Sequence, residues 1–229
     1  MYLSRLRLNR DSIEAIYKYK RKSGNNLFWE HQMIWDLFDN APEQKRDFLY
    51  RHEDPKSGLP FYYLLSARLP KNNPIAADIQ TREYRPTLRA NDRLQFSLRA
   101  NAVVTRKAGD TGKRRIRRDI IEAKVDEYKQ RFDNPSDRPS PAVIHQEAAQ
   151  VWLERRGKQL GFSLESLMVD NHRFYEVKKP SDDNVRRFTS IDLYGRLLVE
   201  DPKFLVAALM TGLGRAKAFG CGLLLVRRI

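Results

Sequence analysis

The first half of the chain combines two kinds of hydrophobic spacing. Residues 2–9 alternate polar and apolar side chains, which predicts a strand. Helical spacing follows at 11–19 and again at 27–38. Further strands are expected at 48–53, 61–69 and 75–84, with turn residues between the first two. This order predicts an α+β sandwich with helices on one face.

The second half begins with another long alternating run, at 94–104. A loop at 107–113 follows, and the basic segment Arg114–Arg118 returns from it. Beyond this arm, helices are expected at 119–132, 142–160 and 202–211, and strands at 164–178, 186–199 and 222–228. The second half therefore also contains strand, helix, strand, strand, helix and strand, without a convincing residue-level repeat of the first half.

Composition adds a strong positive charge to this picture. The 229 residues are 41% hydrophobic, enough for a core. Lys and Arg number 43 against 29 Asp and Glu, which gives a formal net charge of +14. This excess favours a polyanionic partner, either nucleic acid or an anionic membrane. Basic ribosomal proteins share the property, so charge alone does not indicate catalysis.

The single cysteine, Cys221, excludes an intramolecular disulfide framework and a multi-cysteine zinc site. A reduced, cytoplasmic location is expected. The N-terminal segment lacks the apolar stretch of a secretory signal, and no window approaches the roughly 18 apolar residues that span a bilayer. No membrane partner is therefore expected.

His31 is the strongest candidate for acid–base chemistry in the first half. Histidine has an ordinary pKa of about 6.5 and can transfer a proton in phosphodiester cleavage. A partly buried helix histidine without a chemical role is the alternative. His52, His145 and His172 show no metal-ligand spacing, and no acidic cluster of the two-metal type is present. A nuclease here is expected to need no metal and to use a ribose 2′-hydroxyl, which requires RNA.

The stretch from Arg99 to Arg118 contains eight Lys or Arg residues and one acidic residue. We expect a hairpin arm whose guanidinium groups contact duplex phosphates and recognise shape more than sequence. A solvated charge run is the alternative. The RNA-binding candidates in this stretch are Arg99, Arg106, Lys107, Lys113, Arg114, Arg115, Arg117 and Arg118.

A glycine-rich segment, Gly212–Leu224, lies between the last helical pattern and the last strand. Glycine allows backbone N–H groups to approach a ligand closely, and two cations in the segment favour a phosphate. The helix-to-strand order excludes a Rossmann turn, and no Gly-Lys-Ser/Thr follows as in a nucleotide-triphosphate loop. A glycine C-cap followed by a turn is the alternative. The RNA-binding candidates here are Gly214, Arg215, Lys217, Gly220 and Gly222, with both cationic side chains expected to be exposed.

Together these segments resemble the CRISPR RNA-processing endoribonucleases of type I-E Cascade, the CasE family of the RAMP superfamily. The resemblance covers almost the whole chain, and its histidine block and final block are the most specific. It is carried, in the family's order, by MYLSRLRL, HQMIWDLF, FSLRANAV, VWLERRGKQLGF and GLGRAKAFGCGLL.

The resemblance implies two tandem ferredoxin-like (RRM-like) domains with antiparallel sheets, which we place at 1–90 and 91–229. It implies cleavage of the CRISPR repeat hairpin at the base of its stem, without metal or cofactor. The products are a 2′,3′-cyclic phosphate (or 3′-phosphate) and a 5′-hydroxyl. The protein, a monomer when free, then stays on the mature RNA with the other Cascade subunits.

His31 falls on the catalytic histidine of this family. Some members have a tyrosine three residues earlier, where this chain has Phe28. Tyr17 and Tyr19 are the candidates to replace that hydroxyl. The missing tyrosine leaves an alternative open: a catalytically inactive or slow hairpin-binding protein of the same fold.

Overall fold

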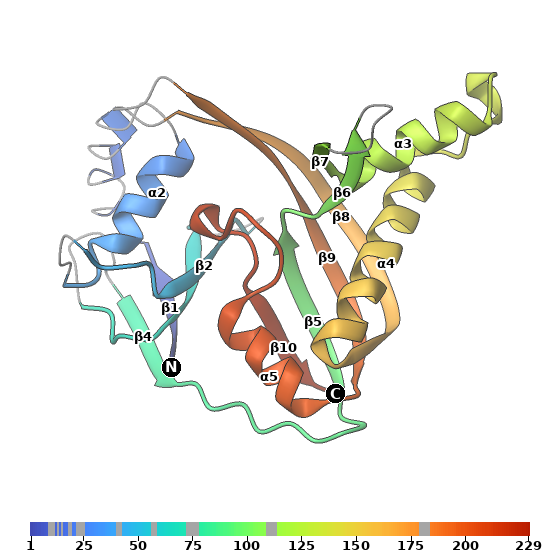
Figure 1. The fold of residues 1–229 in the computed structure, drawn as a ribbon. Helices are drawn as coiled ribbons and strands as arrows, with labels where there is room; N and C mark the ends of the chain where they lie inside the picture. Colours follow the sequence, from blue (N-terminus) through green and yellow to red (C-terminus); the bar gives the residue numbers. More distant parts are fainter. Residues whose placement is uncertain are drawn as a thin grey trace.

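Two antiparallel four-stranded sheets, one in each half of the chain, form the framework of the computed structural model (Figure 1). The structure describes residues 1–8, 12, 14, 16–17, 20–21, 26–39, 43–55, 59–71, 78–108, 114–178 and 184–229.

The first sheet has the strand order β2-β3-β1-β4. Alternate residues of its strands face inward, so that Leu6 and Leu64 are buried. Helix α2 (Asn26–Trp35) packs on this sheet because Met33 and Ile34 share one apolar cluster with those leucines. The strands are β1 (Tyr2–Arg7), β2 (Phe48–Glu53), β3 (Phe61–Ser66) and β4 (Asp78–Glu83).

The second sheet has the order β10-β5-β9-β8. Helices α4 (Pro141–Leu160) and α5 (Pro202–Thr211) pack on one of its faces, where Trp152 and Leu209 meet Leu98 in the larger core. The opposite face contacts the first sheet through polar residues such as Ser97 and Arg99 and through Leu225, which packs in an apolar cluster with Leu49 and Leu65. The strands are β5 (Arg93–Ala100), β8 (Phe162–Lys178), β9 (Val185–Val199) and β10 (Leu224–Arg228).

Both sheets have ferredoxin-like topology. In each, the first strand lies between the third and the fourth, and every pair is antiparallel. The second unit has both connecting helices, α4 and α5, whereas the described residues 67–71 between β3 and β4 form no helix. The predicted α+β fold with two ferredoxin-like units is confirmed. The boundary after residue 90 falls between β4 and β5 and stays a prediction.

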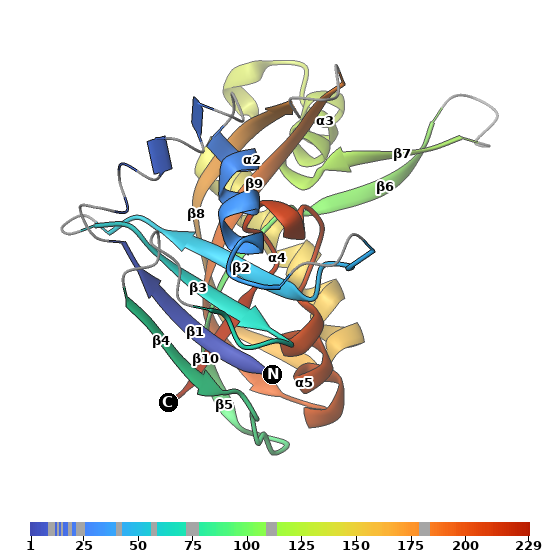
Figure 2. The same ribbon diagram turned by 90° about the vertical axis from the view of Figure 1, so that its left-hand side faces the viewer.

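A two-stranded arm interrupts the second unit after β5. It consists of β6 (Val103–Ala108) and β7 (Arg114–Asp119) and projects away from both sheets (Figure 2). Helix α3 (Ile120–Arg131) follows at once, because the Asp119 carboxylate accepts hydrogen bonds from the first free backbone N–H groups of the helix. The predicted returning arm is therefore present.

Several helices and strands have boundaries that differ from those predicted from the sequence. The single strand expected over 94–104 is wrong, because the chain leaves the sheet at Asn101, whose side-chain amide donates to the Thr189 carbonyl. The helix expected at 27–38 ends at Trp35. The helix expected at 11–19 lies largely outside the described residues. No helix in the described part of the chain is long and apolar enough to cross a membrane.

Candidate active site and nucleic-acid interface

The glycine-rich segment forms a closed loop between α5 and β10. The Leu213 N–H donates to the Gly222 carbonyl at 2.9 Å, and the Gly222 N–H donates to the Arg99 carbonyl at 2.7 Å. Gly212 and Gly222 have φ of 75° and 91°, and a Cβ on either would lie 2.7 Å from the carbonyl oxygen of another loop residue. These glycines are therefore required by the shape of the loop itself.

The loop also contacts the first domain. The Tyr50 hydroxyl of β2 donates to the Ala218 carbonyl at 3.1 Å, and Gly220 lies against the Tyr50 ring. Phe219, in the short 3₁₀ turn η2 (Lys217–Phe219), has its ring centroid 6.2 Å from that of His31. The two segments that the sequence singled out thus lie side by side.

His31 lies on α2 in a cluster of aromatic rings. The Trp35 indole Nε1–H donates to His31 Nε2 at 2.9 Å, and the Phe48 ring centroid lies 6.2 Å from the imidazole. An indole N–H can only donate, so Nε2 is the unprotonated nitrogen in this arrangement. Trp35 therefore fixes both the tautomer and the orientation of His31.

A basic cavity of about 420 Å³ lies between the arm, the β8–β9 hairpin and the glycine-rich loop. Each element contributes arginine: Arg117 and Arg118 from β7, Arg187 from β9 and Arg215 from the loop. Phe174 and Phe188 add aromatic surface to its lining. Cations beside aromatic faces are suited to nucleic-acid phosphates and bases.

Stacked rings connect this basic cavity to His31. Phe188 stacks on Phe219 with centroids 5.5 Å apart and planes inclined by 21°. Tyr175 also stacks on Phe188, with centroids 5.1 Å apart. Because Phe219 contacts the imidazole as well, the rings of Phe188 and Phe219 would connect a nucleic acid in the basic cavity to His31.

The arm presents two different faces. Arg115 and Arg117 are two residues apart, lie on one face and are exposed, without a hydrogen bond or ion pair to another described side chain. On the other face, Arg118 pairs with Asp126 of α3, and Arg106 donates to the Ala123 carbonyl. Lys113 lies outside the described residues, as do the side chains of Lys107 and Arg114.

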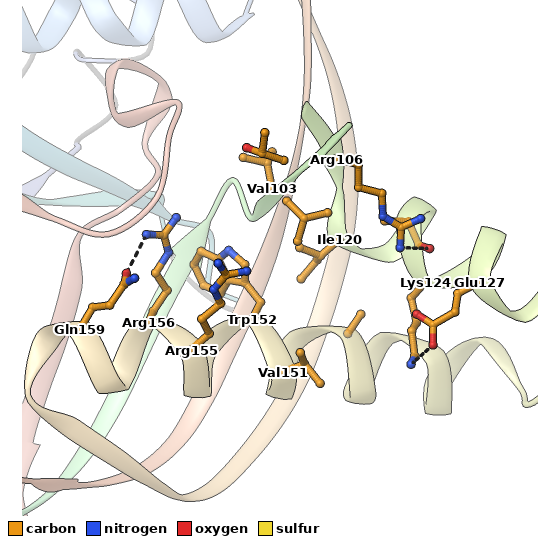
Figure 3. Close-up of a pocket in the computed structure, with 14 residues that line it drawn as sticks. Val103, Arg106, Ile120, Lys124, Glu127, Val151, Trp152, Arg155, Arg156 and Gln159 are labelled. Carbon is orange, nitrogen blue, oxygen red and sulfur yellow. Dashed lines mark hydrogen bonds and ion pairs between the residues drawn. The ribbon is translucent and has the colours of Figure 1, made fainter. Parts of the chain in front are cut away.

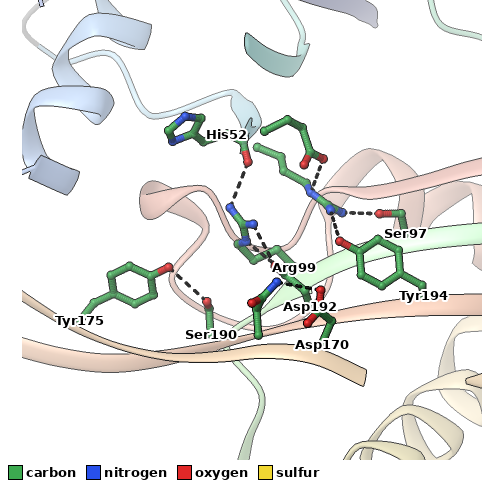
Figure 4. Close-up of polar contacts among 11 residues, drawn as sticks. His52, Ser97, Arg99, Asp170, Tyr175, Ser190, Asp192 and Tyr194 are labelled. Atoms are coloured by element: carbon green, nitrogen blue, oxygen red, sulfur yellow. Dashed lines mark hydrogen bonds and ion pairs between the residues drawn. The ribbon is translucent and has the colours of Figure 1, made fainter. Parts of the chain in front are cut away.

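Arg99 occupies a different environment from the arm. Its guanidinium donates to both carboxylate oxygens of Asp192, at 2.7 and 3.0 Å, and to the His52 carbonyl of β2 (Figure 4). Burial disfavours its charge, but the hydrogen bonds and the charge of Asp192 raise the pKa of Arg99 above its ordinary value. The predicted RNA contact of Arg99 stays a prediction, since these donors are already used by the protein.

Arg51 joins the same inter-domain network from β2. It donates to the Ser97 hydroxyl at 2.6 Å and to the Tyr194 hydroxyl at 3.4 Å, and pairs with Glu53 at 2.7 Å. Together with Arg99, it connects the two sheets through polar contacts directly beside the glycine-rich loop.

Lys217 differs from the exposed cation expected from the sequence. Its Nζ donates to the Thr211 carbonyl at the end of α5 at 2.7 Å, and the side chain is half-buried. Burial, with the nearby charge of Arg46, lowers the pKa of Lys217. The expected exposure of Lys217 is therefore wrong, whereas Arg215 is exposed as predicted.

Two of the remaining histidines pair with carboxylates, and the His145 ring lies against that of His172, with centroids 5.4 Å apart. His52 lies 2.9 Å from Glu30, and His172 lies 3.4 Å from Asp119. Among the described residues, no three His, Cys, Asp or Glu side chains come together as a metal site would need. Tyr17 lines a cavity whose lining does not include His31, and Tyr19 lies outside the described residues.

Known proteins share this architecture. A family model described as CRISPR associated protein matches residues 1–228. The chain belongs to this family. It is 28% identical over 209 residues to the CRISPR system Cascade subunit CasE of Escherichia coli (strain K12), and the match covers 89% of this chain and 93% of that protein.

A second relative of this CRISPR-associated protein is the CRISPR-associated endoribonuclease Cse3 of Thermus thermophilus. It is 27% identical over 242 residues, and the match covers 99% of both chains. A solved structure of Cse3 bound to 19 nt RNA matches with a TM-score of 0.71 at 25% identity, covering 99% of this chain and 100% of that one. These similarities confirm the resemblance to the CasE family.

The contribution of β8 and β9 to the site of this CRISPR-associated protein was not predicted from the sequence. Arg187 and Phe188 belong to the segment Val185–Phe188, VRRF, in which two arginines precede an aromatic residue. That basic and aromatic combination was the available signal. Phe174 carries the same kind of signal, in Arg173-Phe174-Tyr175, whereas the role of Phe219 depends on neighbours far away in the sequence.

Proposed function

We propose that this CRISPR-associated protein is an endoribonuclease that cleaves repeat hairpins in precursor CRISPR RNA. The observation that carries the proposal is the contact between the His31 ring and Phe219 of the glycine-rich loop, next to a cavity lined by four arginines. A proton-transfer group thus lies beside a surface suited to a phosphate backbone. The relatives named CasE and Cse3 endoribonuclease support the same activity.

The arm and the basic cavity bind the hairpin. Arg115 and Arg117 contact stem phosphates from the free face of the arm, and Arg187 and Arg215 extend the cationic surface toward the loop. Each phosphate neutralised by a cation releases counterions, so binding weakens as salt increases. Phosphate contacts of this kind position an A-form stem by its shape.

Cleavage proceeds by attack of the ribose 2′-hydroxyl at the cut site. The 2′-oxygen forms a bond to phosphorus, the bond from phosphorus to the 5′-oxygen breaks, and a 2′,3′-cyclic phosphate and a 5′-hydroxyl result. His31 either accepts the proton of the 2′-hydroxyl or donates a proton to the leaving 5′-oxygen. Proton transfer of this kind increases the cleavage rate by about 10²–10⁴-fold. Neighbouring cations stabilise the charge that develops on the phosphoryl oxygens.

The reaction is proposed to need no metal, because the leaving and attacking oxygens can be served by a histidine and cations. After cleavage the protein, a monomer when free, remains on the hairpin and becomes a Cascade subunit, as the name of its CasE relative indicates. The buried free thiol of Cys221, whose pKa is raised by burial to about 12, is consistent with the reduced cytoplasm.

The test uses a repeat hairpin with a single 2′-deoxy substitution at the cut site, in EDTA. We expect the deoxy hairpin to bind normally and remain uncut, while a hairpin with the substitution one nucleotide away is cut. Cleavage of the first substrate would indicate an activated water and a different reaction. Tight binding with no cleavage of any hairpin would instead support the inactive hairpin-binding protein.

A further inference from the structure

A second cavity, of about 440 Å³, lies on the opposite side of the second sheet from His31. Its lining comes from β6, α3 and α4 (Figure 3). Side chains alternate across a strand, so the residues of β5 that pack on α4 point away from the first domain. The cavity therefore lies across the sheet from His31 and borders the basic cavity at the base of the arm, where Val103 lines both.

The floor of this α3–α4 cavity is apolar. Val103 and Val104 of the arm base meet Ile120, Val151 and Trp152 from the two helices. Val151 is 63% exposed, although it borders a cavity whose other apolar residues are largely buried. Exposed apolar surface inside a concave site is typical of a protein-binding surface.

Trp152 provides an independent observation. Trp152 is only 5% exposed, and its indole Nε1 is buried without a hydrogen-bond partner among the described residues. A buried donor without an acceptor is costly, typically by about 1–3 kcal/mol. An oxygen atom supplied by a bound segment would satisfy it.

The rim of the cavity is cationic. Arg106, Lys124, Arg155 and Arg156 line it against one carboxylate, Glu127. Lys124 pairs with Glu127, and Arg156 donates to Gln159, whereas Arg155 is exposed and makes no hydrogen bond or ion pair with any described residue. A second copy of this basic chain would bring like charge to the rim, and RNA would leave the apolar floor and the indole donor unused.

We propose that the α3–α4 cavity binds a protein segment of another Cascade subunit, with an apolar side chain on the floor and a carboxylate beside Arg155. The inference rests on the proposed function, since that function supplies the assembly. It gives the protein two separate attachments, one to the RNA hairpin and one to a neighbouring subunit. Central apolar contacts with a charged rim are the usual composition of such interfaces.

The test measures binding of the purified chain to its other Cascade subunits, assembled on a guide RNA that lacks the 3′ hairpin. Val151→Asp and Arg155→Glu should each weaken this binding at least about tenfold. Val143→Asp, at a 45% exposed position of the same helix outside the cavity, and Lys158→Glu serve as matched controls and should bind like wild type. Thermal melting confirms that every variant is folded.

Hairpin binding and cleavage by the same variants complete the experiment. Both should be unchanged, because the cavity lies across the sheet from His31. Wild-type protein that fails to bind the hairpin-free assembly, or cavity variants that bind it like the controls, would overturn the inference. Cavity variants that lose hairpin affinity would make this an RNA surface. If the wild-type protein does not cleave the hairpin, this result would contradict the proposed function instead.

Discussion

At the residue scale, the environment of His31 matters as much as its identity. The imidazole is held by a hydrogen bond from Trp35 and by contacts with Phe48 and Phe219. The sequence placed His31 and Trp35 on one helix, but it could not show that the indole N–H points at Nε2. Side-chain orientation is set by packing against β2 and the glycine-rich loop, which come from distant parts of the chain.

Trp35→Phe tests this hydrogen bond. The indole donates only to unprotonated Nε2, so its loss should favour the protonated imidazole and move the pH–rate profile of single-turnover cleavage to higher pH. Hairpin affinity should not change. Trp29→Phe is the control, because that indole is on the same helix and its Nε1 has no hydrogen-bond partner in the described part of the chain. Identical profiles for both variants would show that Trp35 does not position His31.

At the element scale, the arm divides its cations between two faces. The sequence identified the arm and its charge correctly, because turn residues and alternation are local signals. It could not distinguish the free arginines from those used by the protein. That distinction depends on α3, which places Asp126 opposite Arg118 and the Ala123 carbonyl opposite Arg106.

We predict unequal effects of arm substitutions on hairpin binding. For Arg115→Ala and Arg117→Ala, we plot the logarithm of the hairpin-binding constant against the logarithm of the salt concentration. Each substitution should make this slope less steep by about 0.9, the contribution of one phosphate contact. Arg118→Ala should have a smaller effect, because that guanidinium is already paired with Asp126. Titrations of the repeat hairpin at several salt concentrations measure the slopes. A larger decrease of the slope for Arg118→Ala than for Arg115→Ala and Arg117→Ala would reverse the assignment of the two faces.

Substitutions of the two cations of the glycine-rich loop should also have different effects, one on stability and the other on hairpin binding. Lys217→Ala removes the donor to the Thr211 carbonyl at the end of α5, so the free energy of unfolding should fall by about 1 kcal/mol. Arg215→Ala should leave the melting temperature unchanged and weaken hairpin binding. Thermal melting and binding titrations of both variants distinguish the roles. A normal melting temperature for Lys217→Ala would exclude the structural role.

The order of strands and helices followed from local patterns, and the resemblance implied the ferredoxin-like pairing. The break at Asn101 did not, because that residue is held by Thr189 and by a bridge to Arg215. The stack of Tyr175, Phe188 and Phe219 was also beyond prediction, since it joins three elements. Such contacts depend on how remote segments meet.

At the scale of the whole molecule, buried arginines hold the two domains around the glycine-rich loop. Arg51 of β2 contacts Ser97 and Tyr194 of the second sheet, and Arg99 of β5 contacts the His52 carbonyl of the first. The loop is fixed between these contacts, with Tyr50 on one side and the Arg99 carbonyl on the other. The relative position of His31 and the basic cavity therefore depends on the domain interface.

Arg51→Ala should destabilise the protein strongly. The Arg51 side chain is 2% exposed, and its removal leaves Glu53 and two hydroxyls without their partner, at a cost of about 3 kcal/mol or more. Arg93→Ala is the control, because its side chain is 67% exposed in the pair with Glu165 and should contribute about 0–1 kcal/mol. Denaturant unfolding measures both values. Similar values for the two variants would show that the inter-domain network adds little stability.

The central claim is tested most directly by single-turnover cleavage in EDTA, with wild type and His31→Ala compared. The substrate is the CRISPR repeat hairpin encoded next to the gene of this protein. We predict that wild type cuts at one site without metal, and that His31→Ala is slower by about 10²–10⁴-fold with unchanged hairpin affinity. Equal cleavage rates for the two proteins, or cleavage that requires added metal, would contradict the account.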